Sequence, residues 1–245
     1  QKQQNPQNPQ NPQHWRQPHS FIHKSRSTKP ILDLILYLIL YLILYLIIYY
    51  TIMIPEIVFV VPYRDRAPHK KVFESIMPTI LEDENYKILF IHQKDKRSFN
   101  RGAMRNIGFL NIKETYPDDY KNITIVFHDI DIMPYYKNQF DYKTTPNIVK
   151  HFYGYTWALG GIVSINAEDF EKINGYPNIW TWGLEDNILQ KRCIQSGYSV
   201  DRSQFMSYGN NDNQLIILSH GWDRLIDVKI KQKLDTNETT DGISI

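Results

Sequence analysis

The sequence ITIVFHDID, residues 123–131, decides the fold, because it joins an apolar run to two acids at the end of that run. Its first six residues are β-branched, aromatic or apolar enough to predict a buried strand. The preceding sequence predicts two further strands and two helices, namely strands 57–61 and 86–92 and helices 67–84 and 101–115. Strands that alternate with helices indicate an α/β domain with a mostly parallel central sheet. Ligands of such sheets bind beyond the carboxyl ends of the strands.

The charge of the chain is almost balanced, with 28 basic and 26 acidic residues among 245. Residues 1–30 hold five of the basic residues and no acid, so the later part of the chain is nearly neutral. This balance argues against nucleic acid as a partner, since binding a polyanion requires an excess of positive charge. Cys193 is the only cysteine, so no disulfide can form within the chain.

The N-terminal region differs in composition from the rest. Residues 1–30 are polar and basic and are expected to form a disordered tail. Residues 31–54 are almost entirely apolar, and a helix of that length would span about 36 Å, more than the hydrocarbon core of about 30 Å. We expect a single transmembrane anchor here; a buried core helix or a β-prone repeat are the alternatives. Residues 56–245 form the folded domain. This domain is expected to be translocated to the far side of the membrane, while the short basic tail stays in the cytosol.

Two aspartates, Asp129 and Asp131, follow the strand predicted from the opening sequence. In extended backbone their side chains point the same way and repel one another unless a positive charge lies nearby. A hard divalent cation supplies that charge and can also bridge a diphosphate. The pair is a candidate metal site, although D-x-D is also a common string. After the first strand, Arg64 and Arg66 suit a nucleotide phosphate or base edge, or else lie in a solvated loop.

A second group of candidates begins with Gly160 and Gly161, which permit close approach of a ligand to the backbone or form a plain turn. The segment WTWGLED, residues 180–186, then combines two tryptophans with two acids before a helical run. Aromatic rings stack on the apolar faces of sugars, and carboxylates accept hydrogen bonds from sugar hydroxyls. The alternative is that Glu185 and Asp186 cap the helix and the tryptophans lie in the core. At that position the helix dipole would also keep Asp186 ionised.

Five segments occur in a characteristic order: FVVPYRDR, FNRGAMRNIGF, FHDIDIMP, GGIVSINAEDFEKINGYPN and WTWGLEDN. Together they resemble the β-1,4-galactosyltransferase family, glycosyltransferase family 7, over residues 57 to about 200, with a weaker match that extends to His220. The resemblance implies a GT-A fold, a UDP-sugar donor, a glycan acceptor, Mn²⁺ and inversion at the anomeric carbon. It also implies a type II membrane protein of a Golgi- or ER-like endomembrane, with the catalytic domain, residues 56–245, in the lumen.

The resemblance also assigns a role to individual residues. Asp186 would be the catalytic base that takes the proton of an acceptor hydroxyl, and Glu185, Trp182 and Gly183 would bind the acceptor. Asp131 and His220 would hold the metal. Donor-binding residues would be Arg64, Arg66, Phe99, Arg101, Asp129, Gly160, Gly161 and Trp182.

The sequence departs from the family pattern at several places. Leu184 replaces a glycine and Asn187 replaces an acid, which bears on the acceptor. Ala158, or Trp157 if the alignment shifts by one, stands where galactose-specific members have a tyrosine, which predicts tolerance of N-acetylgalactosamine. We therefore expect an inverting transfer of galactose or N-acetylgalactosamine from a UDP-sugar to a glycan hydroxyl. The alternatives are a transferase for another UDP-sugar and an inactive, membrane-tethered glycan-binding module.

Overall fold

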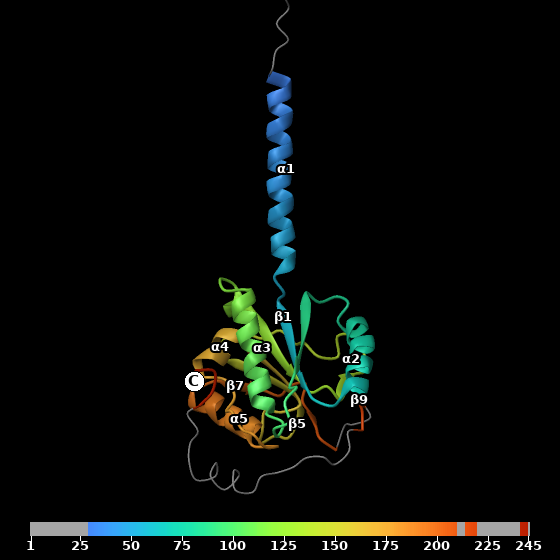
Figure 1. Cartoon of the computed structure of the whole chain (residues 1–245), viewed down its shortest axis with the longest axis vertical. Helices are drawn as coiled ribbons and strands as arrows, with labels where there is room; N and C mark the ends of the chain where they lie inside the picture. Colours follow the sequence, from blue (N-terminus) through green and yellow to red (C-terminus); the bar gives the residue numbers. More distant parts are fainter. Residues whose placement is uncertain (1–28, 210–213, 220–240, 245) are drawn as a thin grey trace, which may run out of the picture. The chain divides into compact units, whose positions relative to one another are not determined.

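The computed structural model describes residues 29–209, 214–219 and 241–244 (Figure 1). The chain divides into two units, residues 1–48 and residues 49–245. Helix α1, Lys29–Met53, matches the predicted apolar helix to within two residues at each end. Its Lys29–Ile48 part has a mean hydropathy of 2.8 and no buried residue, so it is long and apolar enough to cross a membrane. Most of the predicted disordered tail, residues 1–28, lies outside the described residues.

The second unit contains the predicted alternation of strands and helices. Its described elements are β1 Ile57–Tyr63, α2 Ala67–Ile80, β2 Tyr86–His92, α3 Arg101–Thr115, the 3-10 turn η1 Tyr120–Asn122, β3 Thr124–His128, β4 Ile132–Pro134, β5 Ile148–Gly154, β6 Ile162–Asn166, α4 Ala167–Lys172, α5 Glu185–Gln195, β7 Ser199–Asp201, β8 Met206–Ser207 and β9 Leu215–Ile217.

The main sheet has the strand order β2-β1-β3-β6-β5-β7, with β8 also paired to β5. Strand β1 is parallel to β2 and to β3, and β5 is parallel to β7 and β8, whereas β6 runs antiparallel to β3 and β5. The prediction of a mostly parallel sheet is confirmed. The reversal at β6 pairs His128, the last residue of β3, with Ile162, the first residue of β6. The loop after β3 and the loop before β6 therefore lie side by side at the carboxyl end of β3.

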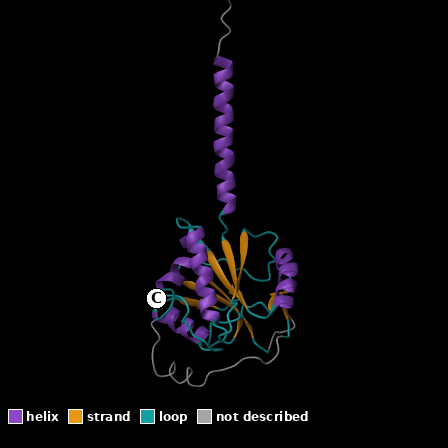
Figure 2. Cartoon of the chain, viewed as in Figure 1, coloured by secondary structure: helices purple, strands orange, loops and turns teal. Residues whose placement is uncertain are grey.

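Helices cover both faces of this sheet (Figure 2). Because successive side chains of a strand point to opposite faces, Val58 and Val60 of β1 pack with Phe109 of α3, whereas Phe59 packs with Phe73 of α2. All five side chains are fully buried. Burying an apolar side chain of this size stabilises the fold by roughly 1.5–3 kcal/mol. The two apolar layers therefore hold the sheet in place, together with the loops at the ends of its strands.

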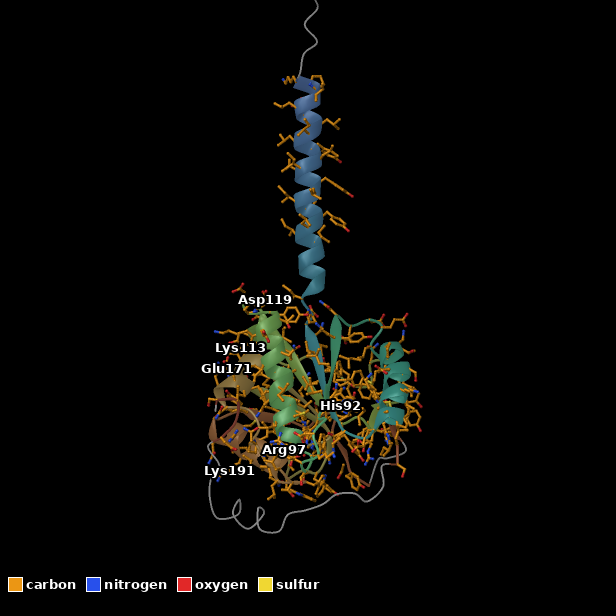
Figure 3. All side chains as sticks on the ribbon, viewed as in Figure 1. His92, Arg97, Lys113, Asp119, Glu171 and Lys191 are labelled. Atoms are coloured by element: carbon orange, nitrogen blue, oxygen red, sulfur yellow. The ribbon has the colours of Figure 1, made fainter. Side chains whose placement is uncertain are left out.

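The ends of the helices and strands mostly agree with the prediction, and local hydrogen bonds explain some of them. The predicted bounds of β2 and α3 are confirmed, and α3 begins at Arg101 because the Asn100 side chain accepts a hydrogen bond from the Ala103 N–H at 2.8 Å. Helix α2 tolerates Pro78 but ends at Ile80 rather than at the predicted residue 84. Farther along α3, Lys113 forms an ion pair of 2.5 Å with Glu171 of α4, and the two lie close together in Figure 3.

Candidate active site

A cavity of about 310 Å³ opens beyond the carboxyl ends of β3 and β5. This volume lies at the lower end of the range for small-molecule pockets. The predicted site residues among its lining are Arg101, Asp129, Asp131, Gly160, Gly161, Trp182, Gly183 and Asp186. The structure therefore brings together eight predicted residues from four separate segments of the chain. Ala158 and Trp157, the two candidates for donor choice, also line the cavity.

Arg101, at the first position of α3, lines this cavity and joins three acids. Asp129 and Asp186 also line the cavity, whereas the predicted acceptor-binding residue Glu185 does not, and its side chain is 4% exposed. Its Nε lies 2.6 Å from Glu185, its Nη1 lies 2.9 Å from Asp129, and its Nη2 lies 2.5 Å from Asp186. Burial alone would lower the pKa of the guanidinium, but the three carboxylates outweigh burial and raise that pKa well above its ordinary value. Arg101 is permanently charged here, and each of its terminal nitrogens donates to a carboxylate.

A second arginine, Arg105, lies one helical turn farther along α3 and is fully buried. Its Nη1 contacts Asp186 Oδ1 at 2.5 Å and its Nη2 contacts Asp129 Oδ1 at 3.0 Å. The guanidinium carbon is also 4.8 Å from the centre of the Tyr176 ring. Arg105 was not among the residues that the sequence predicted for the site. The available signal was its i, i+4 spacing from Arg101 on a predicted helix, which puts both side chains on one face.

Asp186 lies in the first turn of α5, beside Glu185. The prediction that the helix dipole keeps this carboxylate ionised is incomplete. Burial raises the pKa of Asp186 to about 6, and Arg101 and Arg105 oppose that rise. The carboxylate is therefore ionised at neutral pH yet titrates close to it, which suits a general base. Of the capping alternative, the position is as expected, because Glu185 and Asp186 lie in the first turn of α5, but the N-cap residue is Leu184 and no side chain caps the helix.

The two glycines make room for protein atoms at the cavity wall. A Cβ on Gly160 would lie 2.5 Å from Asp186 Oδ2, and a Cβ on Gly161 would collide with the Tyr153 carbonyl oxygen. Gly161 also has a φ of 71° and accepts a hydrogen bond from the Asp129 N–H at 2.9 Å. Gly160 thus makes room for the Asp186 carboxylate, and Gly161 makes room for the Tyr153 carbonyl near the end of β5.

The segment before α5 contains unusual backbone. Gly183 has a φ of 95° and Leu184 a φ of 75°, and both line the cavity. Left-handed backbone favours glycine and costs a leucine about 1–2 kcal/mol, so the departure at Leu184 is a strained position. Trp182 is 38% exposed and also lines the cavity. A partly exposed indole there has an open face for an apolar ligand surface.

Asp129 and Asp131 differ in their surroundings. The backbone turns at residues 130 and 131, so the expectation of extended backbone through Asp131 is wrong. Asp129 binds the two arginines, whereas the carbonyl oxygen of Asp131 accepts a hydrogen bond from the Leu218 N–H at 2.8 Å. Described residues near Asp131 do not include three potential metal ligands in one cluster. His220, the other predicted ligand, lies outside the described residues.

The predicted donor residues Arg64, Arg66 and Phe99 do not line this cavity. The Arg64 guanidinium lies 5.5 Å from the centre of the Phe99 ring and donates to the Arg97 carbonyl oxygen. Arg97, labelled in Figure 3, stacks 3.6 Å from the Trp180 ring. The role of Arg64, Arg66 and Phe99 in binding a donor stays a prediction.

Three tyrosines that the sequence did not suggest, Tyr153, Tyr155 and Tyr208, also line the cavity. The Tyr155 ring stacks on Trp157 at 4.6 Å and lies 5.2 Å from the Tyr208 ring. Their exposed fractions are 43% for Tyr155, 62% for Trp157 and 49% for Tyr208. No motif marks these residues, because each is a single tyrosine in a loop or at a strand end.

A mostly parallel sheet with helices on both faces and a cavity beyond its carboxyl ends is the arrangement of nucleotide-binding α/β folds. Similarity to a solved glycosyltransferase identifies the GT-A class among them. The catalytic domain of Drosophila β-1,4-galactosyltransferase 7, solved in complex with xylobiose, has the same fold, with a TM-score of 0.66 and 24% identity over 77% of this chain and 83% of that chain. A mutant of that enzyme in complex with manganese, UDP-Gal and xylobiose gives a TM-score of 0.65.

The chain belongs to glycosyltransferase family 7. A model described as the N-terminal region of glycosyl transferase group 7 matches residues 51–143, and one described as the N-terminal domain of galactosyltransferase matches residues 146–213. The predicted family is thereby confirmed.

Three curated relatives illustrate the similarity. Rat β-1,4-galactosyltransferase 6 is 31% identical over 61% of this chain and 41% of its own length. Human β-1,4-galactosyltransferase 5 is 32% identical over 61% of this chain and 40% of its own length. The xylosylprotein 4-beta-galactosyltransferase of Caenorhabditis elegans is 30% identical over 62% of this chain and 55% of its own length. The chain thus spans about half or less of the length of these relatives.

Proposed function

We propose that this protein is a galactosyltransferase that moves galactose from UDP-galactose to a hydroxyl of a glycan, with inversion at the anomeric carbon. The observation that carries the proposal is that Arg101, which lines a ligand-sized cavity, is paired with Asp129, Glu185 and Asp186, of which Asp129 and Asp186 also line the cavity. These residues come from three of the segments that resemble the family. The names of the curated relatives support galactose as the transferred sugar.

In the proposed reaction, Asp186 accepts the proton of the acceptor hydroxyl through Oδ2, the oxygen beside Gly160 at the cavity wall. The acceptor oxygen forms its bond to the anomeric carbon as the bond from that carbon to the UDP oxygen breaks, and the electron pair leaves with UDP. Glu185 Oε2 is buried without a hydrogen-bond partner among the described residues. Glu185 does not line the cavity and its side chain is 4% exposed, so a second hydroxyl of the acceptor would reach this oxygen only after Arg101 has moved toward the donor. That contact would then orient the acceptor.

Arg101 holds the acids together when no donor is bound. A diphosphate in the cavity would compete for its guanidinium, because phosphate oxygens accept the same paired hydrogen bonds as a carboxylate. Movement of Arg101 toward the diphosphate would release Glu185 and Asp186 for the acceptor. The arginine would thereby stabilise the charge that develops on the leaving UDP.

We further propose Mn²⁺ as the cofactor, held by Asp131 and His220. The fit rests on the oxygen chemistry of Asp131, which lines the same cavity as Arg101. His220 follows Ser219 directly, and the chain up to Ser219 runs beside Asp131 through the Leu218 hydrogen bond. When bound, the ion would neutralise charge on the departing diphosphate.

Helix α1 is proposed to be a single membrane anchor, with the catalytic unit in the lumen of a Golgi- or ER-like compartment. Its length and its mean hydropathy of 2.8 support this role. Carbonate treatment of membranes should leave the full chain in the pellet, and glycosylation at Asn237 of the Asn237-Glu-Thr sequence should accompany a lumenal domain. Recovery of the chain in the carbonate supernatant would contradict the anchor.

The function is tested with the full chain in detergent, UDP-galactose and a panel of glycan acceptors, with Mn²⁺ or with EDTA. Release of UDP should depend on the acceptor and on Mn²⁺, and NMR of the product should give the inverted anomer. Asp186→Asn is the matched inactive control. Binding of glycans without either transfer or donor hydrolysis would instead support the glycan-binding alternative.

A further inference from the structure

The two arginines of α3 differ in their access to the cavity. Arg101 lines the cavity and its side chain is 17% exposed, whereas Arg105 is 1% exposed and does not belong to the lining. A substrate can therefore reach Arg101 but not Arg105. When Arg101 turns toward a donor phosphate, Arg105 is the cation that stays with the acids.

Arg105 binds one particular oxygen of Asp186. Its Nη1 holds Oδ1 at 2.5 Å, while the other oxygen, Oδ2, meets Arg101 Nη2 at 2.5 Å and lies beside Gly160. The two oxygens thus have separate environments: Oδ1 is tied to a buried partner, and Oδ2 is tied to a partner at the cavity. Departure of Arg101 would free Oδ2 while Oδ1 stays fixed.

The charges around Asp186 determine how much its contact with Arg105 affects the ionisation of its carboxylate. The groups that face it are Arg101 and Arg105 from α3, Asp129 from the end of β3, Glu185 from α5 and the Tyr176 phenol. Once Arg101 is engaged by a donor, the Arg105 guanidinium still pairs with Asp129 and Asp186, and Glu185 is the chain neighbour of Asp186. Without the charge of Arg105, buried carboxylates this close would take up a proton, and a protonated Asp186 cannot accept another.

We propose that Arg105 is a positioning residue for the base Asp186, which fixes Oδ1 and keeps the carboxylate ionised while Oδ2 takes the proton of the acceptor. This proposal rests on the proposed transferase function. Arg105 acts through Asp186 and touches neither the donor nor the acceptor.

The test is the pH dependence of kcat/KM for the acceptor, measured with the full chain in detergent for the wild type, Arg105→Met and Arg105→Lys. The wild-type rate should fall as pH drops through the pKa of Asp186 in the donor complex. We expect that pKa at or above its value of about 6 in the donor-free protein, because Arg101 no longer opposes the effect of burial. In Arg105→Met the midpoint should move up by about 1–3 pH units, the usual effect of losing a nearby opposite charge. From a wild-type midpoint near 6, the loss at pH 7 should lie between about twofold and about a hundredfold, and it should shrink toward pH 9.

Arg105→Lys keeps the charge but has no planar fork to bridge two acids. Its midpoint should stay near that of the wild type while its kcat falls. The control is Arg192→Met, since the Arg192 guanidinium donates to the backbone carbonyls of Asn174, Gly175 and Asp241. That variant should lose thermal stability and keep the wild-type midpoint.

A double-mutant cycle keeps the test independent of the folding of Arg105→Met. If Arg105 acts through Asp186, Arg105→Lys should cause little further loss in the Asp186→Asn background. An unmoved midpoint in Arg105→Met, or an equal loss from Arg105→Lys in both backgrounds, would overturn the proposal. If the wild type transfers no sugar, the proposed function fails, and carbon-13 NMR titration of the Asp186 carboxyl still measures whether Arg105 lowers its pKa.

Discussion

Replacing Gly160 with alanine would place a methyl group against the carboxylate of Asp186. The new Cβ would lie 2.5 Å from Oδ2 and 3.0 Å from the carboxyl carbon, whereas ordinary contact begins near 3.4 Å. The carboxylate would have to move by about 0.9 Å, the difference between 2.5 Å and 3.4 Å. It is held at both oxygens by Arg101 and Arg105 at 2.5 Å, so that movement breaks or stretches at least one ion pair.

A misplacement of about 1 Å at a reacting group costs about 10²-fold in rate. We therefore expect Gly160→Ala to lower the turnover number for galactose transfer by about that factor. The expected loss of stability is about 1–3 kcal/mol, the usual cost of overpacking. Gly160 does not have left-handed backbone, so alanine adds no conformational strain of its own.

Initial rates at saturating UDP-galactose and acceptor, together with thermal melting, measure the two effects. Gly197→Ala is the matched control: Gly197 has a φ of 79° and no atom within 4 Å of a new Cβ. That control should lose about 1–2 kcal/mol of stability and keep its turnover. Turnover of Gly160→Ala within about threefold of the wild type would show that the Asp186 position is not set by this contact.

Three further substitutions test other parts of the site. Asp186→Asn should keep UDP affinity but lose roughly 10²–10⁴ in turnover, measured under single-turnover conditions. Because burial raises the pKa of Asp186 to about 6, the wild type should lose stability relative to that variant as pH rises from about 4 to about 6, a difference that chemical denaturation at each pH would reveal. Asp131→Asn should abolish Mn²⁺-dependent UDP binding in calorimetry, and unchanged affinity would remove Asp131 from the metal site. Ala158→Tyr should shift the ratio of rates with UDP-N-acetylgalactosamine and UDP-galactose toward galactose, since a ring would occupy the space of the acetamido group; an unchanged ratio would point to Trp157 instead.

The sequence predicted the parallel part of the sheet well, because β1, β2 and β3 are short apolar runs with clear boundaries. The reversal of β6 had no local signal, since the direction of Ile162–Asn166 depends on which strand it pairs with. The end of α2 was also missed. Residues 81–84 have a composition suited to a helix, but the chain turns there, with the Glu84 N–H bonded to the Leu81 carbonyl oxygen at 2.9 Å.

Most of the residues that the motifs predicted do line one cavity, but the motifs did not specify the contacts among these residues. Asp129 and Arg101 were each assigned to the donor, and the structure pairs them with one another. Arg105 was missed because an arginine on a helix is ordinarily exposed, and its burial depends on acids that are distant in the sequence. Side-chain pairing of this kind is decided by the tertiary fold rather than by local pattern.

The ion pairs of α3 also have a consequence for biosynthesis. Arg101 leaves the ribosome 84 residues before Glu185, and Arg105 leaves it 81 residues before Asp186. Until α5 is made, α3 can bury its arginines only against Asp129, and an uncompensated buried charge is strongly unfavourable. We therefore expect nascent chains that stop short of α5 to hold α3 undocked. Docking of α3 on the sheet should therefore be complete only after Glu185 and Asp186, the two acids that the site requires, have been synthesised.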